Sequence, residues 1–394
     1  MKVLILGAGV AGPALAYWLL QYGFTPTMIE SAPQLRTGGY LIDFWGAGFD
    51  IAERMGILPE IRRKGYRLRE LKVVNAQGKR VAGFLVDAFF RATRDRYVSL
   101  PRTDLANAIF SQVDGRIEAI FGDTVQSLVQ SERSVQVTLK SGLVREFDLV
   151  VGADGLHSRI RELVFGPERE FEKYLGFKVA AFIADGYKHR DELAYIMFTE
   201  VGQQVGRFTL REDRSMFHFT FADEDPEIPA KLIDQKILLR KRFENGGWEC
   251  HQILEALDRS REIYFDRASQ IRMNGVNGLW SRGRVALVGD AAFCVSLLAG
   301  QGCALAMIAA YILAGELKRC QGDYIEAFRR YQSLFGPFVL KKQNSALRLA
   351  SSFAPKSRSG LFVRNLIFNL MRIPGVVDLA LGNGLADKIE LPDY

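Results

Sequence analysis

The sequence predicts a mixed α/β chain: a Rossmann-like domain with a parallel sheet, interrupted by an α+β domain with an antiparallel sheet, then C-terminal helices. With 394 residues the chain is too long for one ordinary core. Buried-strand patterns run into glycine-rich turns and helices in three separated places, as in parallel sheets. Short alternating runs between the second and third places indicate strands of a different kind.

The first strand, turn and helix form a dinucleotide-binding motif. Val3–Leu6 is a short apolar run, and the G-x-G-x-x-G pattern that follows leads into the apolar stretch 14–20. Gly7 permits the tight turn, Gly9 lets a pyrophosphate approach the backbone, and Gly12 allows close helix–strand packing. The unpaired N–H groups of the helix start attract phosphate. The residues expected to bind the cofactor here are Gly7, Gly9, Val10, Ala11 and Gly12.

A second strand supports this interpretation. The run 25–29 ends at Glu30, which lies 18 residues beyond Gly12 and whose carboxylate can accept from a ribose hydroxyl. The alternatives are a structural glycine turn and, for Glu30, a helix cap or a solvated strand end. The motif indicates an ADP moiety without distinguishing FAD from NAD.

Two further strand-to-turn motifs follow. The run 147–151 leads into Asp154 and Gly155, and the run 285–288 leads into Gly289 and Asp290. Ten residues beyond Asp290 come Gly300, Gln301 and Gly302, which open an apolar helix predicted over 303–317. Glycines at a helix start again form an anion site.

This ordered set of motifs resembles the single-component (group A) FAD-dependent aromatic monooxygenases with the p-hydroxybenzoate hydroxylase fold, over about the first 335 residues. The resemblance implies that Asp290 contacts the ribityl chain of FAD and that the 300–302 backbone lies against the isoalloxazine. It also implies that Asp154 and Gly155 serve both FAD and NAD(P)H. Arg102, at the start of a helix after Pro101, matches the family's FAD-contacting arginine; an ordinary helix-entry charge is the alternative.

Within that family the chain is most similar to the tetracycline-inactivating monooxygenases, or tetracycline destructases. The similarity lies in the segments 10–13, 36–43, 310–317 and 391–394. It implies that Arg36 contacts NADPH or FAD and that Asp43 lies on the FAD side. One departure concerns the segment 293–299, which lacks the proline that family members usually carry beside the flavin and substrate.

The region from about 170 to 270 is expected to form the substrate domain. Runs at 178–184, 194–199, 206–210 and 215–221 predict an antiparallel sheet, which strands near 72–74 and 80–85 join. Alternation places the phenylalanines of the last run on one face, which either covers a planar substrate or belongs to the core. The substrate-pocket candidates are Phe217, Phe219 and Leu297. Helices are predicted at 229–243 and 248–257.

These patterns predict three units. They are a discontinuous FAD-binding domain (1–70, 100–170 and 272–335), a substrate-binding domain (71–99 and 171–271) and a C-terminal helical segment (336–394). That last segment carries eight basic and four acidic residues after residue 340, which is +4 of the net charge of +7. A membrane-surface helix is possible there, but a solvated helix face is favoured.

Composition excludes several classes. Hydrophobic residues make up 48% and charged residues 25%, which is ordinary for a globular protein and excludes a disordered or fibrous one. The four cysteines form no C-x-x-C pair and the four histidines show no metal spacing. No aromatic-interleaved basic patch indicates nucleic acid. No transmembrane span or signal peptide is evident. We therefore expect a cytoplasmic protein, monomeric by preference, without metal.

The sequence and the resemblance together predict a monooxygenase that uses FAD, NADPH or NADH, and O₂. The resemblance implies hydroxylation of a small aromatic or polycyclic substrate, including a tetracycline-like one, through a flavin C4a-hydroperoxide. The protein would supply orientation and a dry pocket, and no acid or base residue is assigned. The alternatives are a FAD-dependent reductase or dehydrogenase of the same fold and a silent flavin- or ligand-binding protein.

Overall fold

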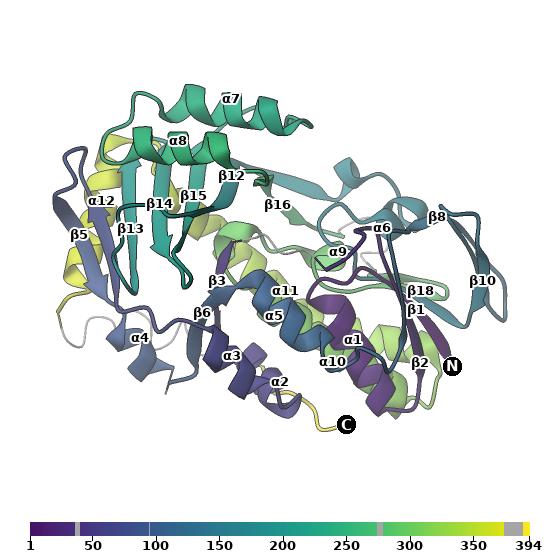
Figure 1. Ribbon diagram of the computed structural model, residues 1–394. Coiled ribbons are helices and arrows are strands. Elements are labelled where there is room, and N and C mark those ends of the chain that lie inside the picture. The colour runs from purple at the N-terminus through teal and green to yellow at the C-terminus, as the bar shows by residue number, and fades with distance from the viewer. Residues whose placement is uncertain (36–39, 94, 274–278, 374–388) are drawn as a thin grey trace.

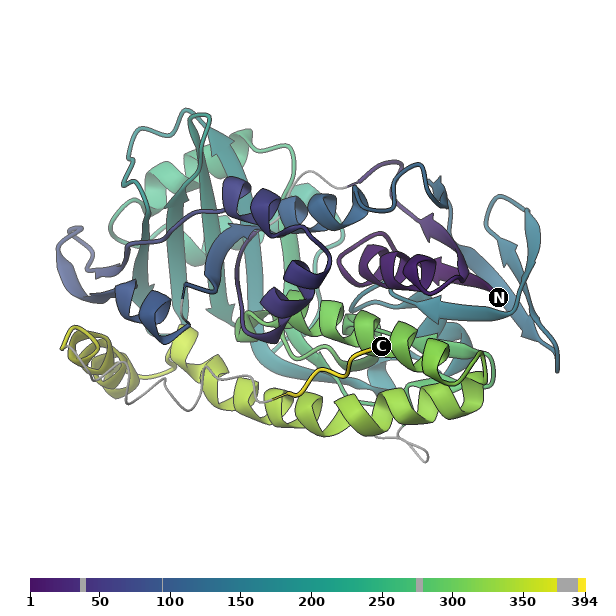
Figure 2. The same cartoon turned by 90° about the horizontal axis from the view of Figure 1, so that it is seen from below.

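The computed structural model describes residues 1–35, 40–93, 95–273, 279–373 and 389–394. Arg36, one of the expected cofactor contacts, lies outside the described residues. The described chain contains two large sheets, side by side in Figure 1, with long C-terminal helices running beneath both in Figure 2.

The first sheet is parallel apart from one edge strand. Its order is β17-β18-β11-β1-β2-β7, and β17 alone runs antiparallel. Leu4 of β1 pairs with Thr27 of β2 and with Val150 of β11, so the first motif is placed between the other strands. The strands are β1 (Lys2–Leu6), β2 (Thr25–Glu30), β7 (Glu118–Phe121), β11 (Leu149–Gly152), β17 (Ser281–Arg282) and β18 (Val285–Leu287).

Helices and two small sheets complete this half of the molecule. The predicted apolar helix at 303–317 is α10 (Gly302–Arg319), whose buried surface packs on α1. The helices are α1 (Ala11–Gln21), α2 (Ala47–Arg54), α3 (Leu58–Lys64), α5 (Arg102–Phe110), α6 (Arg159–Val164), α9 (Asp290–Phe293) and α10, with the 3₁₀ turns η1 (Glu168–Glu170) and η2 (Leu297–Ala299). The helix α4 (Asp87–Ala92) lies instead at the other large sheet, where Phe90 packs with Phe208 and Met216. The small sheets pair β3 (Leu41–Trp45) with β6 (Tyr97–Pro101), and β8 (Val125–Gln130) with β9 (Val135–Leu139) and β10 (Val144–Phe147).

The second sheet has the order β16-β12-β15-β14-β13-β4-β5. Its strands are β4 (Glu70–Val74), β5 (Arg80–Leu85), β12 (Glu172–Asp185), β13 (Ala194–Glu200), β14 (Gln203–Thr209), β15 (Arg214–Ala222) and β16 (Tyr264–Ile271). The expected joining of the 72–74 and 80–85 strands is confirmed. The sheet is not wholly antiparallel, because β4 and β13 pair parallel, with Ile196 beside Lys72. Because β4 comes from a distant part of the chain and no short turn joins it to β13, the two strands can pair in either direction.

Two helices, α7 (Leu232–Phe243) and α8 (Cys250–Arg259), cover the outer face of this sheet (Figure 1). Phe217 and Phe219 lie in this layer, at most 1% exposed, and pack with Phe182 and Phe243. The expectation that they line the substrate pocket is therefore wrong, and the core alternative holds. Alternation along β15 sends odd-numbered residues to the helices and even-numbered residues to the other face.

The C-terminal helices bridge the two halves. The helix α11 (Tyr324–Phe353) is 30 residues long and passes without a break through the boundary predicted at 335/336. It is followed by α12 (Arg358–Leu370), which packs beside β5. In the described part of the chain no helix combines the length and apolarity needed to cross a bilayer. The domain boundaries themselves stay a prediction.

Candidate flavin site

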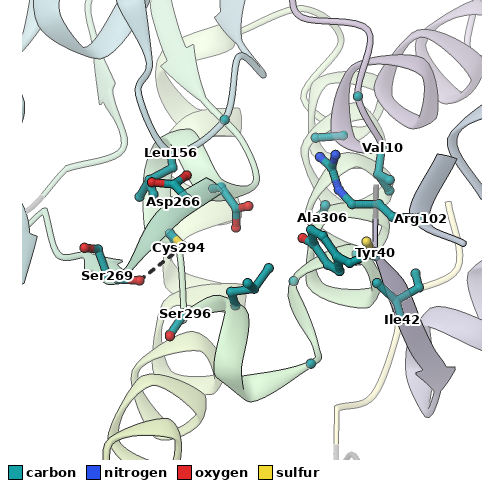
Figure 3. A pocket seen from close by; sticks show the side chains of 18 of the residues that line it. Val10, Tyr40, Ile42, Arg102, Leu156, Asp266, Ser269, Cys294, Ser296 and Ala306 are labelled. Atoms are coloured by element: carbon teal, nitrogen blue, oxygen red, sulfur yellow. Dashed lines mark hydrogen bonds between the residues drawn. The ribbon is translucent and has the colours of Figure 1, made fainter. Parts of the chain in front are cut away.

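A pocket opens where the three sequence motifs meet, between the parallel sheet, η2 and strand β16. Figure 3 shows Val10, Arg102 and Tyr40 on one side of it, and Asp266, Ser269 and Cys294 on the other. Nine of the predicted site residues line this pocket: Gly9, Val10, Ala11, Arg102, Gly155, Asp290, Leu297, Gly300 and Gly302. The fold thus brings motifs from residues 9 to 302 into one cavity.

The glycines of the first motif have different physical roles. A Cβ on Gly7, whose φ is +109°, would lie 2.5 Å from the Ala153 carbonyl oxygen. A Cβ on Gly12 would lie 1.9 Å from the Gly7 carbonyl oxygen, so this position tolerates no side chain. A Cβ on Gly9 would meet only the Arg102 guanidinium, at 3.6 Å, because this backbone faces the pocket. Gly7 and Gly12 are therefore needed for the conformation of the loop, whereas the backbone at Gly9 faces the pocket.

Glu30 lies against the same loop. Its Oε2 accepts from the Ala8 N–H at 2.7 Å, and its Oε1 accepts from the Ala32 N–H at 2.9 Å. No side chain caps the start of α1 among the described residues, so N–H groups of its first turn remain free for an anion. An uncapped helix start beside a fixed carboxylate fits the pyrophosphate and ribose of a dinucleotide.

Arg102 and Asp290 form the charged centre of the pocket. Burial raises the pKa of Asp290, while the Arg102 guanidinium and the Cys294 side chain act to lower it. Burial opposes the charge of Arg102, but Tyr40, Cys303 and Asp290 together hold its pKa above the usual value. Asp290 also faces the N-terminus of α10, since a Cβ on Gly302 would lie 3.6 Å from its Oδ1. The pocket can therefore hold a polar, phosphate-bearing chain.

In the second motif, Asp154 and Gly155 have different roles. Both carboxylate oxygens of Asp154 are used within the protein: Oδ1 accepts from Ser158 Oγ at 2.6 Å, and Oδ2 accepts from the N–H groups of Arg159 and Ile160 at 2.7 and 3.1 Å. Asp154 thus holds the start of α6. Gly155, at φ +84°, lines the pocket.

The segment that lacks the family's proline forms the turn η2. Ser296 has a φ of +102°, which is strained for a residue with a side chain, and its Oγ accepts from the Leu298 N–H at 3.3 Å. Gly300 ends the turn in the left-handed region at φ +65°. Gln301 occupies the N-cap position of α10 without a capping hydrogen bond from its side chain, and it does not line the pocket. Leu297 borders the pocket from this turn.

Asp43 lies outside the pocket lining. Its Oδ1 accepts from Tyr97 Oη and from Ser99 Oγ, each at 2.6 Å. These bonds tie β3 to β6 and point the carboxylate toward the second sheet, where it raises the pKa of Tyr195 in addition to the effect of burial. Its neighbour Ile42 lines the pocket instead.

Several lining residues carried no recognisable sequence signal. Tyr40 and Tyr264 approach each other with ring centroids 5.0 Å apart, and each comes from a different half of the molecule. Asp266 lies near them, and Cys294 Sγ donates to the Ser269 carbonyl oxygen at 3.5 Å. The segment 264–269, Tyr-Phe-Asp-Arg-Ala-Ser, has no alternation of apolar and polar residues that would have marked it as a strand beside a pocket. Among the described residues no cluster could hold a metal ion.

Comparison with known proteins agrees with this geometry. The family profile described as "FAD binding domain" matches residues 1–321. A "Flavin-dependent monooxygenase" from an unknown prokaryotic organism is 37% identical over 358 residues, covering 90% of each chain. A protein of the same description from Legionella longbeachae is 32% identical over 100% of this chain and 98% of its own. The crystal structure of tetracycline destructase Tet(51) superimposes with a TM-score of 0.85 at 31% identity, covering 100% of this chain and 99% of that one.

Proposed function

The chain belongs to the FAD-binding-domain family of flavin-dependent monooxygenases, and on that premise we propose that it uses NAD(P)H and O₂ to hydroxylate a small aromatic or polycyclic substrate. The observation that carries this proposal is the presence of Arg102 and Asp290 in one pocket, which lies between the free start of α1 and the start of α10. FAD, when bound, would supply the redox chemistry.

The chain's own residues would bind and orient that cofactor. The first turn of α1 would receive the pyrophosphate, Glu30 the ribose and Asp290 the ribityl chain. The N–H groups at 300–302 would stabilise negative charge at the far end, because the positive end of α10 points there. Leu297 and Ile42 add apolar surface that would keep water out.

We also propose a narrower class of substrate. Similarity to a tetracycline destructase over the whole chain supports a polycyclic substrate of tetracycline type. The strained turn at Ser296 replaces the proline-containing segment of the family and would shape the substrate side of the pocket. We therefore expect substrate preference, rather than cofactor binding, to differ from that of the destructases.

The test uses the purified chain loaded with FAD. We expect bound FAD, NADPH or NADH oxidation stimulated by a tetracycline or phenol, one O₂ consumed per product, and a product mass increased by one oxygen atom. Substrate reduction without O₂ uptake would instead identify a reductase of the same fold. Protein that binds no FAD, or that oxidises neither nucleotide with any member of a panel of tetracyclines, phenols and polycyclic aromatics, contradicts the proposal.

A further inference from the structure

The inner face of the second sheet carries a row of side chains that begins at the pocket. Pairing places Tyr264 of β16 beside Ala181 of β12, Ala181 beside His218 of β15, and His218 beside Gly206 of β14. Directly paired residues point to the same face, and Tyr264 lines the pocket. His218 is therefore two strands, about 10 Å, from the pocket wall.

This face is turned toward the first half of the molecule. Met216, two residues before His218, receives a hydrogen bond at its Sδ from the Leu41 N–H of β3, at 3.0 Å. Phe217 points the other way, into the layer under α7 and α8. The His218 imidazole consequently faces the space between the second sheet and the β3 strand that borders the pocket.

A tyrosine hydroxyl lies next to this imidazole. A Cβ on Gly206 would lie 2.1 Å from Tyr195 Oη, so the Tyr195 ring covers Gly206, the residue paired with His218. Neither the His218 imidazole nor the Tyr195 hydroxyl has a hydrogen-bond partner within the described part of the chain, and both side chains are partly buried. Two adjacent polar groups on an inner face, without protein partners, are suited to a ligand.

The charge states of His218 and Tyr195 limit the class of ligand that this pair can bind. Burial lowers the pKa of His218 to about 4, so the imidazole is neutral at pH 7 and offers one donor and one acceptor. The Asp43 carboxylate acts on Tyr195 from β3 and would repel an anion there. Arg364 of α12 contacts the sheet at a different cross-strand pair, Thr199 and Gln204. There its Nη1 donates to Thr199 Oγ1 at 3.1 Å.

Resting on the proposed function, we infer that His218 and Tyr195 bind the substrate. They would receive the hydroxyl or carbonyl group of an uncharged, multi-ring substrate whose reacting end lies in the flavin pocket. Hydrogen bonds to neutral partners favour a phenol or ketone over a carboxylate of the same ring system, since within the described residues no cation contacts this pair to offset the desolvation of an anion.

The experiment measures binding rather than turnover. FAD-loaded protein is titrated with 2-naphthol, naphthalene and 2-naphthoate, which share one ring system, and the flavin absorbance change gives each Kd. We expect 2-naphthol to bind at least about fivefold tighter than 2-naphthoate, with a Kd constant between pH 6 and 8. His218→Phe should weaken 2-naphthol about five- to tenfold, the usual size for one lost neutral hydrogen bond, and leave naphthalene unchanged.

Matched variants separate binding from folding. His218→Gln should restore part of the 2-naphthol affinity, Tyr195→Phe should weaken it, and His251→Gln, an exposed α8 histidine 3.5 Å from Glu255, should change nothing. The inference is overturned if FAD-loaded protein binds none of the three compounds, prefers 2-naphthoate, or has the same 2-naphthol Kd in His218→Phe. Wild-type protein that takes up no FAD would contradict the proposed function itself, and the inference with it.

Discussion

The Tyr394 hydroxyl donates to Oε1 of Glu316 at 2.7 Å, which joins Tyr394 to the last turn of α10 (Gly302–Arg319). The ring lies over Gly315, where a Cβ would be 2.0 Å from a ring carbon. Glu316 is fully buried and is also paired with Arg319 and Arg330. The C-terminal segment 389–394 therefore packs on the same helix whose first turn borders the flavin pocket.

Loss of this hydroxyl is expected to destabilise the protein. Tyr394→Phe removes one hydrogen bond to a buried carboxylate, which should lower the free energy of unfolding by about 1.5–3 kcal/mol. Urea unfolding with and without FAD measures the change. Asp393→Asn serves as the control, because Asp393 is 94% exposed and its ion pair with Arg54 should contribute less than about 1 kcal/mol. Equal stability of Tyr394→Phe and wild type would contradict the expected role.

Gly12→Ala and Gly9→Ala should affect different properties, the first the stability of the FAD-free protein and the second its binding of FAD. An alanine Cβ at Gly12 would meet the Gly7 carbonyl, so we expect a loss of about 1–3 kcal/mol in FAD-free stability. At Gly9 the nearest atom is the flexible end of Arg102, so FAD-free stability should stay near wild type while FAD binding weakens. Thermal unfolding and FAD titration of both variants check this. A Gly9→Ala protein with unchanged FAD affinity would remove Gly9 from the binding surface.

Local motifs in the sequence were sufficient to predict the three strand–turn–helix units, because glycine spacing and the residues around it are fixed by the turn itself. Contacts between distant segments were not predictable in this way. Tyr40 and Tyr264 meet only because β16 runs beside the long strand β12. The same limit explains why Phe217 and Phe219 were expected in the substrate pocket. Alternation showed that they share a face of the sheet, but only the position of α8 shows that this face belongs to the core.

Asp290→Ala should weaken FAD binding. The substitution removes the carboxylate that faces the start of α10 and leaves the buried Arg102 without its acidic neighbour, which is costly in a low-dielectric pocket. We expect the Kd for FAD to rise about 10- to 100-fold, as for the loss of a hydrogen bond to a charged group. Flavin fluorescence quenching gives the Kd. Asp43→Ala is the comparison, because Asp43 lies outside the pocket; a larger effect there than at Asp290 would reverse the two assignments.

His157 should make stability depend on pH in the alkaline range. Its Nε2 lies 3.3 Å from Asp266 Oδ1 and its Nδ1 lies 2.9 Å from Glu168 Oε1, and these hydrogen bonds raise its pKa to about 10. Because the folded pKa exceeds the unfolded value of about 6.5, the stabilisation is complete below pH 6.5 and is lost as the pH rises through 10. His157 is half exposed, so each ion pair should contribute less than about 1 kcal/mol.

The measurement compares wild type with His157→Gln at several pH values. The wild type should unfold at a higher temperature at pH 7, and the gap should close by pH 10.5, when the wild-type imidazole has also lost its charge. The comparison cancels the titration of lysines and tyrosines, which both proteins share. Because Asp266 lies in β16 and His157 follows Gly155, the same loss of charge loosens the contact between the two walls of the flavin pocket. A gap that stays constant from pH 7 to pH 10.5 would show that the charge of His157 does not change in this range, which contradicts the raised pKa.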